Sequence, residues 1–288
     1  MEFLNLINKI KMYDIGAMEE DNNNRFNQKY ELYLFEPQEK EYLKLKEKNK
    51  NVYNSFLGDG KEHTFYITRF PGCCSILEPN LELTNQMSTF MAYGLHTNPF
   101  LVLKKEKIVT TKLDDIEIPL PRFIKLDTQG SELLILQNGI SKLKECTVIE
   151  CESEFIQLYK NQPLYGEVDK FLREQGFIFH KFIDFRVPQV CPYVKKNYQG
   201  LLSEEGNQII SADGIWLKNI YDLEKYSNDE LIETSYILFN LYKSYDVVCR
   251  LLYEYCNRIK NNKYIIQYLD YLNKNNLEKY ILNIKSQV

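Results

Sequence analysis

Acidic side chains follow several of the apolar, strand-like segments of this sequence, and their types and spacing suit them to chemistry. Glu36, Asp127 and Glu152 each come directly after such a segment. In open α/β sheets, ligands bind in the crevice outside the carboxyl ends of the parallel strands. A carboxylate there can accept hydrogen bonds from ribose hydroxyls, attract a cationic ligand or take up a proton. The pattern therefore predicts a ligand site at one edge of a sheet.

The stretch FIKLDTQGSELLILQNG at 123–139 has the most definite local pattern. Its short apolar run is typical of a buried parallel strand, and Thr128, Gln129 and Gly130 form a polar turn. Helical spacing of leucines follows, and Gly139 marks the end of the helix. The pattern leaves two roles open for Asp127, which either faces a ligand or caps the helix.

The segment YDIGA at 13–17 is typical of the first strand of a nucleotide-binding unit, in which Gly16 and Ala17 let a ligand approach the backbone closely. A plain surface turn remains an alternative. The three acids within Met18–Asp21 would repel a pyrophosphate, and no GxGxxG motif is present. These features count against a nicotinamide-dependent oxidoreductase. Asp59, in the turn Gly58-Asp59-Gly60, either reaches an adenine or only shapes that turn.

Bulk properties exclude several classes of protein. The 288 residues carry a net charge of −4, which does not favour nucleic acid, and no apolar run approaches the ~20 residues of a membrane span. The N-terminal segment does not resemble a secretory signal. Seven cysteines without a CxxC pair favour reduced thiols in a cytoplasmic protein, and no histidine-rich ligand set predicts a metal.

The order of elements predicts an α/β fold. Expected strands, helices and strand pairs are interspersed up to residue 218, and residues 184–212 are expected to be irregular. We predict a catalytic or binding domain at 1–221 and an α-helical appendage at 222–288. Expected strands cover 12–15, 30–35, 51–57, 63–68, 123–126, 146–151, 177–182 and 214–217, with a strand pair at 100–103 and 108–111 and helices at 39–49, 131–137 and 165–176.

The C-terminal part has a different pattern. Ser227 to Glu230 matches a capping box, and 231–259 has helical spacing that predicts two helices, with a further one at 264–284. The sequence does not decide whether this tail packs on the core, dimerises or recruits a partner, and it leaves the oligomeric state open.

The acids at successive strand ends fit a cofactor with a ribose, an adenine and a positive charge, such as S-adenosylmethionine, better than a dinucleotide. The sequence also resembles FkbM-type methyltransferases, a family of class I S-adenosylmethionine-dependent enzymes, over about residues 12 to 218. The segments that carry the resemblance keep the family's order and spacing. They are YDIGA at 13–17, YLFEPQ at 33–38, LGDGKEHTFYITRFPGCCSILEPN at 57–80, TTKLDDI at 110–116, FIKLDTQGSELLILQNG at 123–139, ECESEFIQLYKNQPLYGEVDKFLREQGF at 150–177 and ADGIWLK at 212–218.

The resemblance implies a Rossmann-like sheet of seven strands with helices on both faces and an antiparallel last strand, and methyl transfer to oxygen. By matching positions, it also implies roles for individual residues. Asp14, Gly16, Ala17 and Asp127 would lie at the methionine end of S-adenosyl-L-methionine, Glu36 at the ribose and Asp59 at the adenine. Ser75 would face cofactor or substrate, and Glu132 belongs to the same motif in either a functional or a structural role.

Methyl transfer to a hydroxyl needs a group that removes its proton. We expect Asp127 or Glu152 to be that base, ahead of His63, His96 and His180. The expected partner is a small-molecule or glycan acceptor, and its hydroxyl is not identified by any residue. The family's second glycine is missing between Met18 and Asp21, so the alternative is a non-catalytic Rossmann-like binding module with a degenerate cofactor loop.

Overall fold

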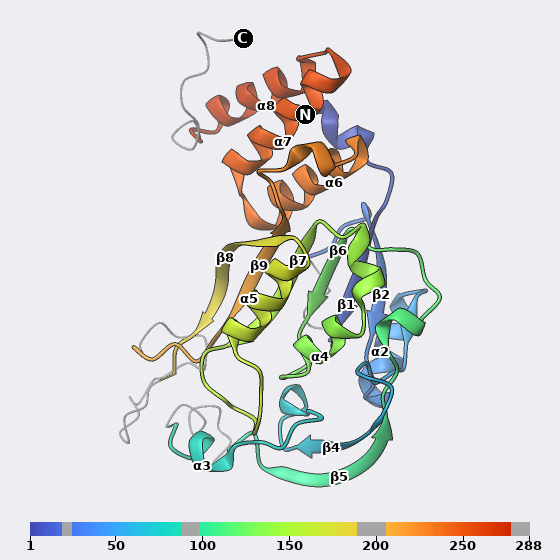
Figure 1. Ribbon diagram of the computed structural model, residues 1–288, viewed down its shortest axis with the longest axis vertical. Coiled ribbons are helices and arrows are strands. Elements are labelled where there is room, and N and C mark those ends of the chain that lie inside the picture. The colour runs from blue at the N-terminus through green and yellow to red at the C-terminus, as the bar shows by residue number, and fades with distance from the viewer. Residues whose placement is uncertain (19–24, 88–97, 189–205, 278–288) are drawn as a thin grey trace.

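The computed structural model describes residues 1–18, 25–87, 98–188 and 206–277, and its centre is one twisted sheet (Figure 1). Seven strands lie in the order β3-β2-β1-β6-β7-β9-β8. All neighbours from β3 to β7 are parallel, whereas β9 is antiparallel to both β7 and β8. This is the predicted α/β, Rossmann-like fold. The strands are β1 Ile10–Ile15, β2 Tyr30–Phe35, β3 Val52–Tyr53, β6 Phe123–Leu126, β7 Val148–Glu154, β8 Phe177–Arg186 and β9 Ser211–Lys218.

Helices cover both faces of this sheet. On one face, α4 (Glu132–Gln137) and α5 (Tyr165–Glu174) bury Ile135 and Leu172 against Ile15, Leu126 and Trp216. On the other, α2 (Glu39–Lys48) packs Leu45 against Leu34 and Val52. A short helix, α3 (Leu81–Thr84), lies outside the sheet (Figure 1).

A second, two-stranded sheet lies beyond the carboxyl ends of β1, β2 and β6 (Figure 1). It pairs β4 (Glu62–Thr68) with β5 (Val102–Val109) in antiparallel register. The predicted pairing of 100–103 with 108–111 is therefore wrong, because 102–109 form one strand. Its Lys104, Lys105 and Lys107 are exposed. The charged residues between the two predicted strands therefore belong to one continuous strand that faces solvent.

The third predicted strand is also shorter than expected. The chain leaves the sheet after Tyr53, where the side-chain amide of Asn54 donates to the carbonyl oxygens of Glu36 (3.2 Å) and Pro37 (3.1 Å). Residues 54–57 are thereby directed across the carboxyl ends of the strands.

The C-terminal helices pack on the same face as α2, at the end where β6 and β7 begin. The predicted pair of helices within 231–259 is confirmed as α6 (Asn228–Ile237) and α7 (Tyr245–Ile259), joined by a π-helical turn at Leu238–Tyr242. The third, α8, ends at Lys274, and the predicted remainder from 278 lies outside the described residues. These helices share one apolar cluster with the sheet, in which Leu231, Leu238 and Leu252 join Met12, Phe123 and Val148. The domain boundary at 221/222 stays a prediction.

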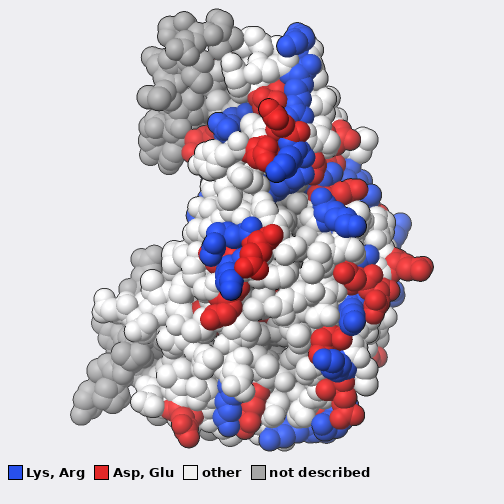
Figure 2. Space-filling view, viewed as in Figure 1, with Lys and Arg blue, Asp and Glu red and all other residues white. Residues whose placement is uncertain are grey.

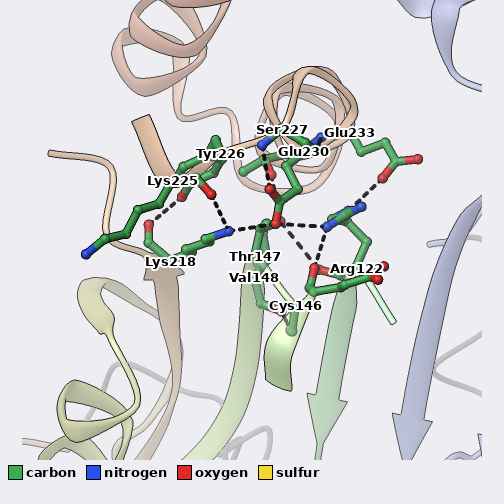
Figure 3. A network of polar contacts seen from close by, with 12 residues as sticks. Arg122, Cys146, Thr147, Val148, Lys218, Lys225, Tyr226, Ser227, Glu230 and Glu233 are labelled. Carbon is green, nitrogen blue, oxygen red and sulfur yellow. Dashed lines mark hydrogen bonds and ion pairs between the residues drawn. The ribbon is translucent and has the colours of Figure 1, made fainter. Parts of the chain in front are cut away.

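A buried ionic network joins this tail to the sheet (Figure 3). Glu230 of α6 lies between Arg122 and Lys218, at 3.2 Å and 2.7 Å, and Arg122 also contacts Glu233 at 2.6 Å. The predicted capping box is present, since Ser227 and Glu230 exchange hydrogen bonds of 2.6 Å and 3.1 Å. The network fixes the first turn of α6 on the sheet.

The molecular surface seen in Figure 2 mixes acidic and basic side chains along the whole length of the protein, without an extended area of one sign. Within the described ranges, no helix combines the length and the apolarity needed to cross a membrane.

Candidate functional site

The site begins where β1 and β6 end side by side. Gly16 follows β1 with a φ of +84°, and a Cβ at this position would lie 1.8 Å from the carbonyl oxygen of Asp127. The amide of Asp127 in turn donates to the carbonyl of Ile15 at 2.9 Å. Only glycine allows the two strand ends to approach this closely. The sequence thus brings Gly16 and Asp127 together, as predicted from their positions at strand ends.

A pocket of about 300 Å³ opens at these strand ends. It is bounded by the carboxyl ends of β1, β2 and β6 on one side and by β4 and the 70–76 loop on the other. Among the described lining residues the only charged side chains are those of Glu36 and Asp127, and no Lys or Arg is present. The pocket thus combines two carboxylates with a largely apolar wall. Its further lining includes Ile15, Gly16, Met18, Phe35, Gln38, Phe56, Leu57, Phe65, Phe70, Cys74, Ser75, Thr128 and Gln129.

Glu36 follows β2 and is only 3% exposed. Its carboxylate accepts a hydrogen bond of 2.6 Å from the amide of Gln38. Burial raises the pKa of Glu36 from 4.5 to about 7, against the effect of the Gln38 amide. The carboxyl group is therefore held at the pocket wall and changes its charge close to neutral pH.

The turn after β6 is shaped by Glu132, the first residue of α4. Its carboxylate accepts hydrogen bonds from the amides of Thr128 (2.7 Å) and Gly130 (3.0 Å) and from the Thr128 hydroxyl (3.0 Å). Glu132 therefore has a structural role, one of the two that the sequence left open. Inside this turn Gln129 adopts a left-handed conformation with a φ of 59°. This conformation directs the Gln129 side chain toward the strand ends.

Gln129 connects the two acids that were predicted as bases. Its side-chain amide donates to Asp127 at 2.8 Å and to Glu152 at 2.7 Å. Asp127 lines the pocket, whereas Glu152 of β7 lies behind Gln129 and does not. Asp127 does not cap α4, since the residue before that helix is Ser131.

The two acids have opposite electrostatic surroundings. Burial and the charge of Asp127 raise the pKa of Glu152 well above its ordinary value. Burial also works against ionisation of Asp127, but the charge of Lys125 and hydrogen bonds from Glu152 and Gln129 bring its pKa below the ordinary value. Within this coupled pair, Glu152 therefore favours its protonated form and Asp127 favours its anion.

Two buried residues hold Gln129 in place. The hydroxyl of Ser75 donates to the Gln129 carbonyl at 2.7 Å and accepts from the Leu77 amide at 2.9 Å. The hydroxyl of Tyr159 lies 3.1 Å from Gln129 Oε1 and 2.9 Å from the Cys73 carbonyl. Ser75 thus lines the pocket, with its hydroxyl engaged by the protein, and its role toward cofactor or substrate stays a prediction.

Three predicted residues do not line the pocket. Asp14 is fully buried on the face of β1 opposite to Ile15. Its Oδ1 lies 3.5 Å from Lys125 Nζ, and its Oδ2 has no partner among the described side chains and backbone groups. Ala17 is buried against Leu34, and its amide donates to Phe35 at 3.1 Å. Asp59 contacts His63 Nε2 at 2.7 Å, so its carboxylate belongs to the turn before β4. Their cofactor-binding roles stay predictions.

His63 and His180 lie away from the pocket. His63 contacts Asp59, and His180 Nε2 lies 2.7 Å from Ser244 Oγ, while His96 is outside the described residues. Over the part of the chain that the structure describes, no group of three His, Cys, Asp or Glu side chains is arranged to hold a metal ion.

Sequence reasoning missed the aromatic wall of the pocket. Phe56 and Phe65 form an edge-to-face pair with ring centroids 4.8 Å apart, and Phe70 is 50% exposed beside them. The sequence did contain one signal. Phe70 is a large apolar residue in the polar loop RFPGCC, directly after a strand-like segment.

The family of the chain follows from comparisons with known proteins. A crystal structure of the methyltransferase FkbM from Methylobacillus flagellatus KT is 13% identical to this chain, with a TM-score of 0.38. The likeness covers 73% of this chain and 44% of that one, so the chain spans less than half the length of that protein. No curated protein matches the chain. The model of the methyltransferase FkbM domain matches residues 14–179, more than half of the sequence, and the chain therefore belongs to the FkbM methyltransferase domain family.

Proposed function

We propose that this protein is an S-adenosylmethionine-dependent O-methyltransferase that methylates a hydroxyl of a sugar, in a surface polysaccharide or glycan precursor. Membership of the FkbM family supports methyl transfer. The observation that carries the cofactor is the pocket, where Glu36 and Asp127 meet at the carboxyl ends of three parallel strands and the described lining holds no basic side chain.

The chemistry of this lining fits the cofactor. A dinucleotide would bring a pyrophosphate to a wall that carries two acids and no cation among the described residues, and this is unfavourable. S-adenosylmethionine carries no phosphate and has positive charge on its sulfur and amino group. When bound, it supplies a methyl group activated by the cationic sulfur.

Each part of the pocket wall then has a task. The Glu36 carboxylate accepts hydrogen bonds from the two ribose hydroxyls, since one carboxylate can accept from both. Asp127 attracts the cationic end, and Gly16 leaves backbone space beside it. The paired rings of Phe56 and Phe65 provide an apolar surface for the adenine. Methyl transfer requires the acceptor oxygen, the methyl group and the sulfur in line, and a pocket that aligns them would supply up to ~7–11 kcal/mol.

Asp127 is the preferred base for the acceptor hydroxyl. It lines the pocket and its surroundings favour the anion, whereas the surroundings of Glu152 favour the protonated form and Gln129 separates Glu152 from the pocket. Gln129 holds the Asp127 carboxylate in a fixed orientation through its 2.8 Å hydrogen bond. The sugar class rests on the range of acceptors implied by the family resemblance.

Calorimetric titration with S-adenosylmethionine and with its demethylated product tests the cofactor. We expect micromolar binding to the wild type, and at least tenfold weaker binding, ~1.4 kcal/mol, in Glu36→Ala. Glu47→Ala is the matched control, because Glu47 is an exposed acid of α2 that does not line the pocket. Screening of sugar acceptors for methyl transfer then tests the substrate class.

A non-catalytic binding module is the second candidate, because the chain lacks the second glycine of the cofactor turn at 18–21. Absence of binding to the wild type would favour it. Cofactor binding without transfer to any acceptor of a broad hydroxyl library would also favour it over the enzyme.

A further inference from the structure

The outer strand β8 contains an irregularity that changes the direction of one arginine. Ile183 pairs with Asp213 of β9, and Arg186 pairs with Ser211, so three steps along β8 match two steps along β9. The extra residue forms a β-bulge, in which Asp184 is left-handed with a φ of 49°. Side chains alternate along a regular strand, and without the bulge Arg186 would lie on the face opposite to Ile183. The bulge instead puts Arg186 on the face that carries Asp213.

On that face Arg186 enters the group of acids behind the pocket. Its Nη1 donates to Asp213 Oδ1 at 2.9 Å and to the Asp184 carbonyl at 3.2 Å, and its Nε lies 3.5 Å from Glu152 Oε1. Glu152 is joined through Gln129 to Asp127. A continuous chain of contacts therefore runs from the bulge to the carboxylate that lines the pocket.

The charge of Arg186 matters because the acids around it outnumber the cations. Burial raises the pKa of Asp213 to about 6, and Asp127 adds to this effect, whereas Arg186 opposes it. Arg186 likewise lowers the pKa of Asp127. The other groups that act on this cluster are Lys125 of β6, Glu132 of α4, Glu150 and Glu154 of β7, and Cys73 and Tyr159 from loops.

We propose that Arg186 is a positioning residue of the methyl-transfer site. The bulge in β8 directs it toward Glu152 and Asp213, where its contacts hold the Glu152–Gln129–Asp127 chain and its positive charge faces this group of acids. This rests on the proposed function, in which Asp127 acts as the anionic group of the pocket. Arg186 touches neither cofactor nor acceptor in this role. It acts through Glu152 and Gln129.

The test is the pH dependence of kcat at saturating cofactor, which removes the effect of Glu36 on affinity, for the wild type, Arg186→Gln and Arg186→Lys. Removal of the positive charge makes Asp127 accept a proton at higher pH. We expect the acid limb of the kcat profile to shift upward by about one pH unit in Arg186→Gln, and by less in Arg186→Lys, which keeps the charge. Arg173→Gln removes an arginine from a surface pair with Asp169 and is the matched control with an unchanged profile.

The outcomes separate the two proposals. A wild type that binds no cofactor contradicts the proposed function. In that case the role of Arg186 is decided by whether the difference in melting temperature between Arg186→Gln and the wild type changes with pH. A wild type that is active, beside an Arg186→Gln profile that coincides with it, overturns the inference alone. A loss of activity by one factor at every pH, with no shift, also overturns it, because that is the effect of a merely structural residue.

Discussion

The carbonyl oxygen of Asp127 occupies the space in which a side chain at residue 16 would begin, since a Cβ on Gly16 would lie 1.8 Å from it. The conformation of Gly16, with a φ of +84°, adds strain for any other residue. We expect Gly16→Ala to lower the free energy of unfolding by about 3 kcal/mol or more, because the backbone of β6 cannot retreat without losing its pairing with β1. Urea denaturation measures this loss.

The control for this prediction is Gly166→Ala. Gly166 lies in α5, and a Cβ there would meet no atom within 4 Å. Its free energy of unfolding is expected to stay the same or to rise by about 0.5 kcal/mol. Equal losses in both variants would contradict the account of Gly16.

Glu36 should make cofactor affinity depend on pH. Its pKa of about 7 means that the carboxylate that accepts from ribose is a minor form at pH 6 and the major form at pH 8. We expect affinity for S-adenosylmethionine to rise by up to about tenfold between these values. Glu36→Gln should bind weakly at both pH values and lose this dependence, as calorimetry at each pH will check.

The same shift affects stability in the opposite direction. The pKa of Glu36 in the folded protein lies above the ordinary 4.5, so its protonated form favours the fold. The corresponding stability is fully present below about pH 4.5 and is lost as the pH rises through about 7. Without cofactor, the melting temperature of Glu36→Gln relative to the wild type should therefore increase over this range. A constant difference would contradict the raised pKa.

Three of the residues that the sequence singled out line the pocket together, and they share a position directly after a parallel strand. Gly16, Glu36 and Asp127 meet because the carboxyl ends of neighbouring parallel strands lie at the same edge. This follows from strand order and needs no knowledge of side-chain direction. The seven-stranded sheet was predictable for the same reason, together with the family resemblance.

Side-chain direction was not predictable in the same way. Asp14 precedes the end of β1 by one position, and strand alternation directs it to the face opposite to Ile15. Phe56 and Phe65 reach the pocket only because the chain leaves β3 early and returns as β4. The polar run in β5 concealed a strand, since charged residues are acceptable where one side of a strand faces water.

Substitutions of the two bridged acids should have unequal effects on transfer. Asp127→Asn removes the ionised group that lines the pocket, and we expect kcat to fall by about 10²–10⁴-fold. Glu152→Gln keeps a group that can donate to Asp127 and should lower kcat by less than about tenfold. Steady-state kinetics of both variants would identify Glu152 as the base if the order were reversed.

Docking of the C-terminal helices onto the sheet should depend on Glu230 (Figure 3). Its carboxylate is nearly buried between Arg122 and Lys218, and Glu230→Ala leaves both cations without this partner in a dry interface. We expect a loss of about 3 kcal/mol in the free energy of unfolding, since removal of one member of a buried pair exposes the desolvation cost of the other. Glu254→Ala breaks a more exposed pair with Arg258 in the same tail and should cost less than about 1 kcal/mol.

Because α6 and α7 share their apolar cluster with β1, β6 and β7, the unfolding of Glu230→Ala should remain a single transition. Two transitions, with the tail melting first, would instead establish residues 222–288 as a unit that folds separately from the sheet.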